Sequence, residues 1–206
     1  MVYPFTIGRG AHFCKLWGLP LPGMMYNKNR MVYFGKIENG QYVHGDADQM
    51  DWNKMPGFSA NGINHKFCSQ RPGWRWNLDK HQYEFQPYVH DNGSRVFNPP
   101  GTESFFVGDS QAFVIDLQDQ YSQWEMRIAL CKHNDLETLT RKDVDFDSLI
   151  TWHTDKIPTT NLVRIALYPY FGGQKRSVGK ISLPVRFMVA DSDLLDTLSD
   201  REPTQQ

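Results

Sequence analysis

Two Asn-Gly pairs place the strongest limit on how this chain folds. Asn39-Gly40 and Asn92-Gly93 each lie between short runs rich in β-branched and aromatic residues. This arrangement is typical of a β-hairpin with a two-residue turn, because Asn and Gly readily adopt the positive φ angles that such a turn needs. We therefore predict two hairpins, one formed by residues 31–37 with 41–44 and one formed by residues 83–90 with 95–97.

Alternation of apolar and polar residues predicts further strands. It is clear in residues 83–90 and cleanest in residues 123–131. Successive side chains of a strand point to opposite faces, so one face of each of these strands belongs in a core. Pro87 has no N–H to donate to a ladder, which favours an edge or a bulge at that point. Shorter β-prone runs occupy residues 104–107, 112–117, 162–168 and 180–189.

The pattern as a whole predicts an all-β fold. About nine or ten strands with hardly any helix favour an antiparallel two-sheet sandwich, a jelly roll of the concanavalin-like kind. We expect a single domain over residues 1–190, with an N-terminal arm at 1–30 and an insertion at 132–160, where the apolar residues keep no consistent period. Residues 191–206 are expected to form a polar C-terminal tail that begins with one or two helical turns at 192–198.

The composition limits which classes of partner the chain can bind and in which cell compartment it is made. The formal net charge is −1, which argues against nucleic acid, because phosphate binding is driven by clustered Lys and Arg. No stretch approaches the roughly 20 apolar residues of a membrane-spanning helix, and the first residues lack the apolar block of a signal peptide. The cysteines Cys14, Cys68 and Cys131 are far apart and odd in number, so no disulfide framework is expected. These features predict a chain made in the cytoplasm without a signal peptide.

Residues 46–76 are the predicted functional surface. They combine tryptophans, acids, a histidine and arginines with repeated Gly, Pro and Asn, which indicates ordered loops of the kind that usually carry binding residues. An exposed aromatic platform here would stack on a sugar ring or anchor a protein neighbour. We expect residues 168–173 to share this surface, so the candidate ligand- or partner-binding residues are Trp52, His65, Arg71, Trp74, Tyr168 and Tyr170.

The tryptophans at positions 74 and 76 have a second interpretation. In a strand, Trp74 and Trp76 point to the same face and Arg75 points to the opposite one. Large aromatic side chains usually bury most of their area, so burial of both tryptophans in the core is favoured over an exposed platform.

Three aspartates form a weak candidate for Ca²⁺. Asp46, Asp48 and Asp51 lie in one short loop, and Ca²⁺ prefers such oxygen ligands. The spacing of an EF-hand is missing from the sequence, so aspartates that cap turns are the favoured interpretation. We therefore expect no cofactor.

A catalytic role is the less favoured interpretation. His65, Arg71 and Tyr88 would supply a base, a cation that neutralises a carboxylate, and an acid, as abstraction of a proton beside a uronic acid carboxyl group requires. No motif supports this set, and a single histidine or arginine in an aromatic loop is more often a hydrogen-bonded structural residue.

Two motifs resemble those of a known group of proteins. Asp51-Trp52-Asn53-Lys54 with the later Gly73-Trp74-Arg75, and the segment LYPYFGG at residues 167–173, resemble small uncharacterised β-sandwich proteins of Bacteroidetes-type bacteria. The resemblance covers residues 10–187 and implies a concanavalin-like jelly roll. It implies no chemistry, because that group has none assigned. The chain departs from the group in lacking a lipoprotein signal and in carrying the 132–160 excursion.

These observations predict a non-catalytic jelly-roll module for binding or assembly. A β-rich module without a signal peptide can leave a cell inside a particle assembled in the cytoplasm. We therefore expect a bacteriophage virion component, such as a head decoration, fibre or tail protein, that is oligomeric or part of a larger particle. The expected partners are protein neighbours in an assembly or a glycan. The alternative is a carbohydrate-binding module or a polysaccharide lyase that acts on an acidic glycan.

Overall fold

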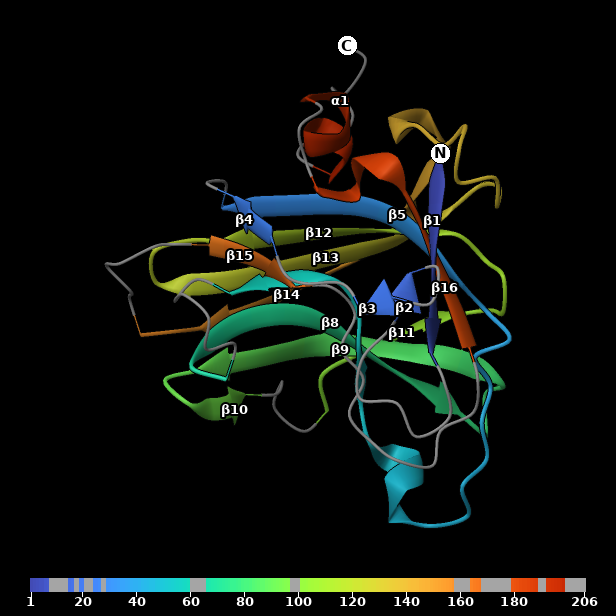
Figure 1. The fold of residues 1–206 in the computed structure, drawn as a ribbon, viewed down its shortest axis with the longest axis horizontal. Coiled ribbons are helices and arrows are strands. Elements are labelled where there is room, and N and C mark those ends of the chain that lie inside the picture. Colours follow the sequence, from blue (N-terminus) through green and yellow to red (C-terminus); the bar gives the residue numbers. More distant parts are fainter. Residues whose placement is uncertain are drawn as a thin grey trace.

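Two antiparallel sheets packed face to face make up most of the computed structural model (Figure 1). The structure describes residues 1–7, 15–16, 19–20, 24–26, 29–59, 66–96, 101–157, 164–167, 179–188 and 192–198. The predicted all-β, two-sheet antiparallel jelly-roll sandwich is confirmed. No helix in these ranges is long and apolar enough to cross a membrane.

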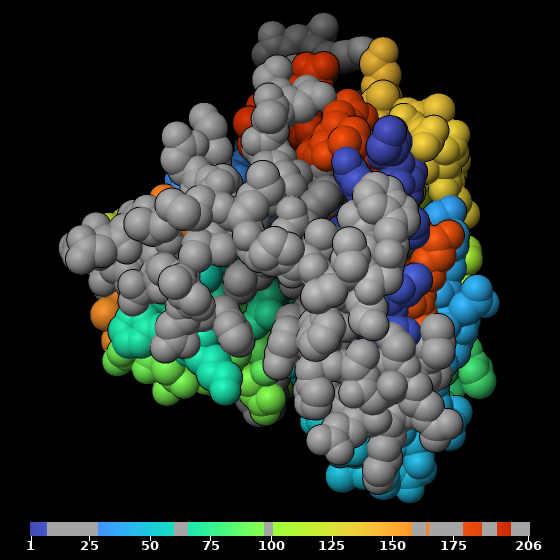
Figure 2. Space-filling view, viewed as in Figure 1, coloured from blue at the N-terminus to red at the C-terminus, as the bar shows by residue number. Residues whose placement is uncertain are grey.

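The first sheet joins strands from both ends of the chain to a central meander. In order across the sheet, its strands are β14 (Val144–Asp155), β13 (Gln123–Cys131), β12 (Phe113–Asp119), β5 (Arg30–Glu38), β16 (Gly179–Pro184), β1 (Val2–Ile7), β2 (Lys15–Leu16) and β3 (Leu19–Pro20). Figure 2 shows the blue atoms of β1 beside the red atoms of β16, which pair antiparallel. The start of the expected N-terminal arm is therefore a strand of the sandwich.

The second sheet carries a hairpin of two 10-residue strands. Its strands in order are β10 (Ser94–Val96), β9 (Gln82–Asp91), β8 (Cys68–Asn77), β7 (Gly57–Ser59), β15 (Arg164–Leu167) and β4 (Met24–Tyr26). Two short strands complete it, because β11 (Phe105–Val107) pairs with β9 and β6 (Asn53–Lys54) pairs with β8.

Short helical turns lie outside the sheets. They are η1 (Ala47–Met50), η2 (Arg141–Asp143), η3 (Val185–Met188), α1 (Ser192–Leu195) and η4 (Asp196–Leu198). The helical turns predicted at residues 192–198 are confirmed by α1 and η4. Leu194 and Leu198 of this segment are buried with the core residues, so the segment adds an apolar layer to the sandwich. Residues 180–189 were expected to be one strand, but β16 ends at Pro184 and η3 follows.

The core lies between the sheets and is rich in aromatic rings. Phe85 of β9 packs against Phe113 of β12 with ring centroids 5.1 Å apart, and Phe58 of β7 lies 5.5 Å from Trp124 of β13. Trp74 and Trp76 belong to the same core, as the favoured interpretation of their spacing predicted. Aromatic pairs of this kind stabilise a fold by about 0.5–1.5 kcal/mol beyond the area they bury.

The two Asn-Gly pairs have different outcomes. Asn92 and Gly93 have φ angles of 48° and 81°, and they join β9 to β10, so the predicted second hairpin is confirmed. The prediction of the first hairpin is wrong, because residues 41–44 form no strand and β5 pairs with β12 and β16 instead. Asn39 has a positive φ of 54° but Gly40 does not, and the Gly40 N–H donates to the hydroxyl of Tyr83 at 2.9 Å.

The stretch expected as an insertion contains a long edge strand. β14 spans 12 residues and pairs with β13 at the end of the first sheet. Val144 and Trp152 are its buried residues, and all of the others are partly or fully exposed. The strand follows η2, so residues 132–157 hold both a helical turn and an element of the sandwich.

Candidate functional site

β8 and β9 present a polar and aromatic face on the side opposite to the core. The two strands pair along their whole length, from Cys68 opposite Asp91 to Asn77 opposite Gln82. Because side chains alternate, Trp74 and Phe85 face the core while their neighbours face the other way. We call the side of the two strands that faces away from the core the outer face of β8–β9. Its residues are Ser69, Arg71, Gly73, Arg75, Glu84, Gln86, Tyr88 and His90.

Three cations surround the ring of Tyr88 on this face. Lys54 Nζ lies 4.4 Å from the ring centroid, and the guanidinium carbons of Arg95 and Arg71 lie 5.7 Å and 6.0 Å from it. Arg71 is also the residue directly opposite Tyr88 in the ladder. Cations over an aromatic face are attracted to its negative π-cloud. The ring of His90 lies 5.4 Å from that of Tyr88.

A second aromatic side chain, Trp52, lies beside Tyr88. A Cβ atom at Gly73 would be 3.3 Å from Cε3 of Trp52 and 3.3 Å from Cβ of Tyr88, so the indole ring packs on the glycine. The guanidinium of Arg75 lies 4.4 Å from the Trp52 ring centroid. The missing side chain at Gly73 therefore makes room for Trp52 on the sheet.

Glu84 fixes the position of Arg75. Its carboxylate accepts hydrogen bonds from Arg75 Nε at 2.8 Å, from Ser104 Oγ at 2.7 Å and from Asn77 Nδ2 at 3.2 Å. Burial alone would raise the pKa of Glu84, but the hydrogen bonds from Arg75, Ser104 and Asn77 outweigh it and hold the pKa below its ordinary value. Glu84 is therefore ionised at neutral pH. Because three donors already occupy its carboxylate, its role is to hold Arg75 in place.

We expect this network to make stability depend on pH in the acid range. The pKa of Glu84 is lower in the folded chain than in the unfolded one, so its contribution is complete above the unfolded value, about 4.3, and is lost as the pH falls through the folded value. Urea unfolding as a function of pH measures this loss. Glu84→Gln should flatten the acid part of the curve, and Glu103→Gln, at an exposed position, should not. An equal slope in wild type and Glu84→Gln would contradict the assignment.

The cluster is accessible at its two ends. Arg95 is exposed and His90 is partly exposed at one end, while Trp52 and Arg75 are partly exposed at the other. Between them, Arg71 is 2% exposed and Tyr88 5% exposed. A ligand would therefore contact the residues at the two ends directly. The buried residues Arg71 and Tyr88 would fix the positions of their neighbours and contribute to the electrostatic potential of the site.

The structure brings together some of the residues that the sequence singled out. Trp52, Arg71 and Tyr88 share the outer face of β8–β9, whereas Trp74 lies in the core. The predicted residues His65, Tyr168 and Tyr170 lie outside the described residues. Sequence reasoning did not find Lys54 and Arg95. Lys54 had a usable signal, because it is two residues after Trp52, and side chains two residues apart in an extended chain point to the same side.

The three aspartates of the weak Ca²⁺ candidate lie around η1. Asp46 accepts a hydrogen bond from the Asp48 N–H at 3.1 Å, and the Asp51 N–H donates to the Asp48 carbonyl at 3.2 Å. Asp46 thus caps a turn, as the favoured interpretation has it. Within the described ranges, no group of three His, Cys, Asp or Glu residues is arranged to hold a metal ion. The expectation of no cofactor stays a prediction.

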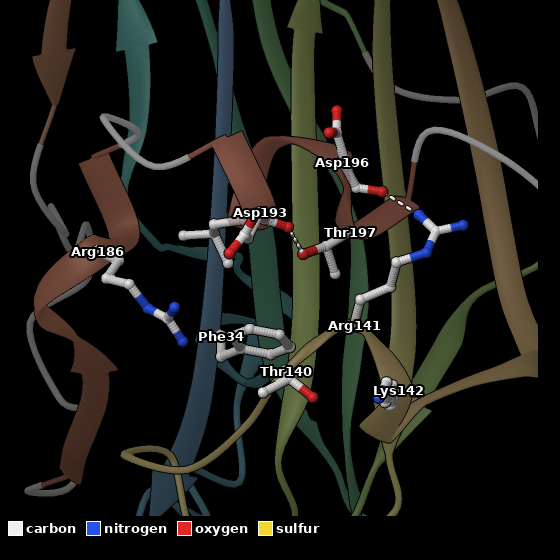
Figure 3. Close-up of a pocket in the computed structure, with 9 residues that line it drawn as sticks. Phe34, Thr140, Arg141, Lys142, Arg186, Asp193, Asp196 and Thr197 are labelled. Atoms are coloured by element: carbon white, nitrogen blue, oxygen red, sulfur yellow. Dashed lines mark hydrogen bonds between the residues drawn. The ribbon is translucent and has the colours of Figure 1, made fainter.

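A separate cavity lies between η2 and the C-terminal segment (Figure 3). It has a volume of 470 Å³, and Phe34 lines it together with the basic residues Arg141, Lys142 and Arg186. Arg141 donates to the carbonyl of Asp196, and Arg186 donates to that of Leu139 at 3.0 Å. These arginines join neighbouring segments of the chain. We therefore take the outer face of β8–β9, and not this cavity, as the candidate site.

The fold and the site define a two-sheet antiparallel β-sandwich with a basic, aromatic outer face. No family model matches the sequence, and a search of curated proteins found no match. Among solved structures the chain is similar to the CBM2 module of the evolved Dit protein of Lactobacillus casei BL23 phage J-1, with a TM-score of 0.35 and 9% identity over 75% of this chain. The chain covers 59% of that structure. Similarity at this level carries no argument about fold or function.

Proposed function

We propose that this chain is a non-catalytic binding module whose outer face of β8–β9 takes an acidic glycan. The observation that carries the proposal is the gathering of Lys54, Arg71 and Arg95 around Tyr88. Cations grouped in this way attract an anionic group, and the attraction is stronger where water is excluded. A carboxylate or sulfate group of a ligand at the exposed end of the cluster, beside Arg95, would be held by this attraction.

An aromatic side chain supplies the second half of a sugar site. The apolar face of a pyranose ring packs on an aromatic ring, and the partly exposed indole of Trp52 offers such a ring at one end of the cluster. Gly73 and Arg75 hold Trp52 from two sides. A side chain that is already fixed loses little conformational entropy when a ligand binds, which favours affinity.

The length of the surface suits a polymer more than a single sugar. From Ser69, opposite His90, to Arg75, under Trp52, β8 advances by about 20 Å at the usual rise of a strand. The two accessible ends of the cluster lie at these two levels. A chain of several acidic sugars would therefore contact Arg95 at one end and Trp52 at the other.

Replacing Arg95 with alanine should weaken binding of an acidic polysaccharide by about fivefold to tenfold, because one exposed charge contact is lost. Isothermal titration with acidic and neutral polysaccharides measures this change, and added salt should weaken the wild-type affinity. Lys80→Ala is the matched control, because Lys80 is also exposed and lies over an aromatic ring, that of Phe106, at 4.2 Å. Equal affinity of wild type and Arg95→Ala would contradict the proposal.

One observation favours the second candidate, a polysaccharide lyase. Arg71 lies opposite Tyr88, and His90 is next to both, with its Nδ1 3.4 Å from Ser69 Oγ. In a lyase, a cation neutralises the uronic acid carboxylate, a base removes the neighbouring proton, and the glycosidic oxygen leaves as a double bond forms. The ultraviolet absorbance of the unsaturated product would reveal this reaction, and its appearance would replace the non-catalytic proposal.

The expected role as a bacteriophage virion component is a question separate from glycan binding. A virion component that binds a host glycan must carry its binding surface on the outside of the particle, and a glycan-binding face is compatible with such a position. Detection of the chain in purified phage particles would support the role, and its absence from them would exclude it. The binding proposal stands without this result, because it depends only on the outer face of β8–β9.

A further inference from the structure

A buried group of charged residues lies at one end of the sandwich, away from the outer face of β8–β9. Asp119 is the last residue of β12 and Lys156 directly follows β14, while Trp124 of β13 lies between them in the ladder. Asp119, Trp124 and Lys156 all face the inside of the sandwich, because each continues the buried alternation of its strand. Arg164 of β15 reaches them from the second sheet.

These side chains are in direct contact and nearly free of solvent. The side chains of Asp119 and Lys156 are 1% and 2% exposed, and that of Arg164 is 11% exposed. Lys156 Nζ contacts Asp119 Oδ1, and Arg164 Nε donates to the other oxygen, Oδ2, at 3.2 Å. The indole ring of Trp124 covers the amine, with its centroid 4.2 Å from Nζ.

Backbone hydrogen bonds hold Asp119 and Lys156 in place. The Asp119 N–H donates to the Asn29 carbonyl at 2.7 Å, and the Lys156 N–H donates to the Ser122 carbonyl at 3.0 Å. Groups fixed in reactive contact behave as if present at effective concentrations of about 10⁵–10⁸ M. Condensation of an amine with a carboxylic acid, which is slow between dilute molecules in water, is accelerated under these conditions.

We propose that Lys156 and Asp119 form an intramolecular isopeptide bond. A proton passes from the ammonium group to Oδ1, and the free amine attacks Cγ of Asp119. Arg164, which already binds Oδ2, stabilises the negative charge that develops there in the tetrahedral intermediate. Oδ1 then leaves as water, with the first proton and a second one from the nitrogen. The product is an amide, and the reaction needs no other reactant.

Burial favours this product over an ion pair. Removing an ion from water costs several kcal/mol, and the triad holds two cations and one anion at a nearly dry site. Condensation removes two of these three charges and expels a water molecule. The charge that remains is that of Arg164, the most exposed of the three, and the new amide oxygen accepts its hydrogen bond. The bond would tie the end of β12 to the chain after β14.

The intact mass of the purified, denatured wild-type chain tests this proposal without any ligand. We expect a mass lower than that of the sequence by one water molecule, and a proteolytic fragment in which the Asp119 and Lys156 peptides are joined. Lys156→Arg should have its full sequence mass, and Asp119→Asn should lose ammonia in place of water.

Two results would overturn the isopeptide assignment. A wild-type chain of full sequence mass would show that the three residues form only an ion triad. Loss of water that persists in Lys156→Arg would assign the dehydration to another reaction, such as cyclisation of an aspartate. The decisive measurement uses the wild type, so a variant that fails to fold does not affect it.

Discussion

Replacing Asp116 with alanine is expected to lower the free energy of unfolding by about 3 kcal/mol, at the lower end of the range for breaking a buried ion pair. The side chain of Asp116 is 0% exposed, and Arg30 donates to its two oxygens at 2.9 Å and 2.8 Å. Without the carboxylate, Arg30 would keep its charge at a mostly buried position. The effect is at the lower end because Arg30 is 18% exposed and reaches some water. Urea unfolding at neutral pH measures the change.

The control is Glu38, a less buried acid on β5, the strand that carries Arg30, and it pairs with lysines of β5 and β16. Glu38 accepts from Lys36 at 2.9 Å and from Lys180 at 2.8 Å, and the Lys180 side chain is 45% exposed. The side chains of Glu38 and Lys36 are 19% and 23% exposed, against 0% for Asp116, and pairs that reach water contribute about 0–1 kcal/mol, so Glu38→Ala should have a smaller effect than Asp116→Ala. Equal losses in Asp116→Ala and Glu38→Ala would show that burial does not decide the contribution of these pairs.

The two Asn-Gly pairs show how far local sequence predicts this fold. Both have the same turn chemistry, and at Asn92-Gly93 the neighbouring strands β9 and β10 are free to pair. At Asn39-Gly40 the chain has stronger tertiary partners. The Asn39 N–H donates to Asp109 at 3.0 Å, and β5 is enclosed by β12 and β16, which follow much later in the sequence. A local pattern cannot reveal partners so distant along the chain.

The edge strand β14 was not predicted for a different physical reason. Strands inside the sandwich bury one face, so their apolar residues alternate, and β13 was predicted with its observed bounds. β14 has a partner on one side only, and several of its apolar residues, such as Leu149 and Ile150, are only partly buried. An edge strand is under weaker selection for alternation, because both of its faces meet solvent over part of their length.

The candidate site was predictable in part, for the same reasons. Composition singled out Trp52 and Arg71, because aromatic and basic residues among turn residues are typical of binding surfaces. It could not show that Arg71 lies opposite Tyr88, because this depends on the register of β8 and β9. Arg95 joins the cluster only because the Asn92-Gly93 turn folds β10 back along β9.

Replacing Gly57 with alanine is expected to destabilise the fold by about 3 kcal/mol and to weaken binding of the acidic glycan. A Cβ atom at this position would be 2.1 Å from the backbone oxygen of Gln70 and 2.4 Å from Cγ of Arg71. The backbone oxygen cannot move without disturbing β8, and Arg71 would have to leave its place beside Tyr88. Urea unfolding measures the first effect, and isothermal titration of the folded variant measures the second.

Gly108→Ala is the control, because the nearest atom to a Cβ there, Oε1 of Gln111, is 3.4 Å away, an ordinary contact. This variant should keep the wild-type stability to within about 1 kcal/mol and the wild-type affinity, since its backbone needs no positive φ. If Gly57→Ala loses stability but binds as the wild type does, Arg71 is a structural residue and the ligand contacts must lie at the exposed ends, at Trp52 and Arg95. If it loses affinity as well, the position of Arg71 against Tyr88 is part of what the ligand recognises.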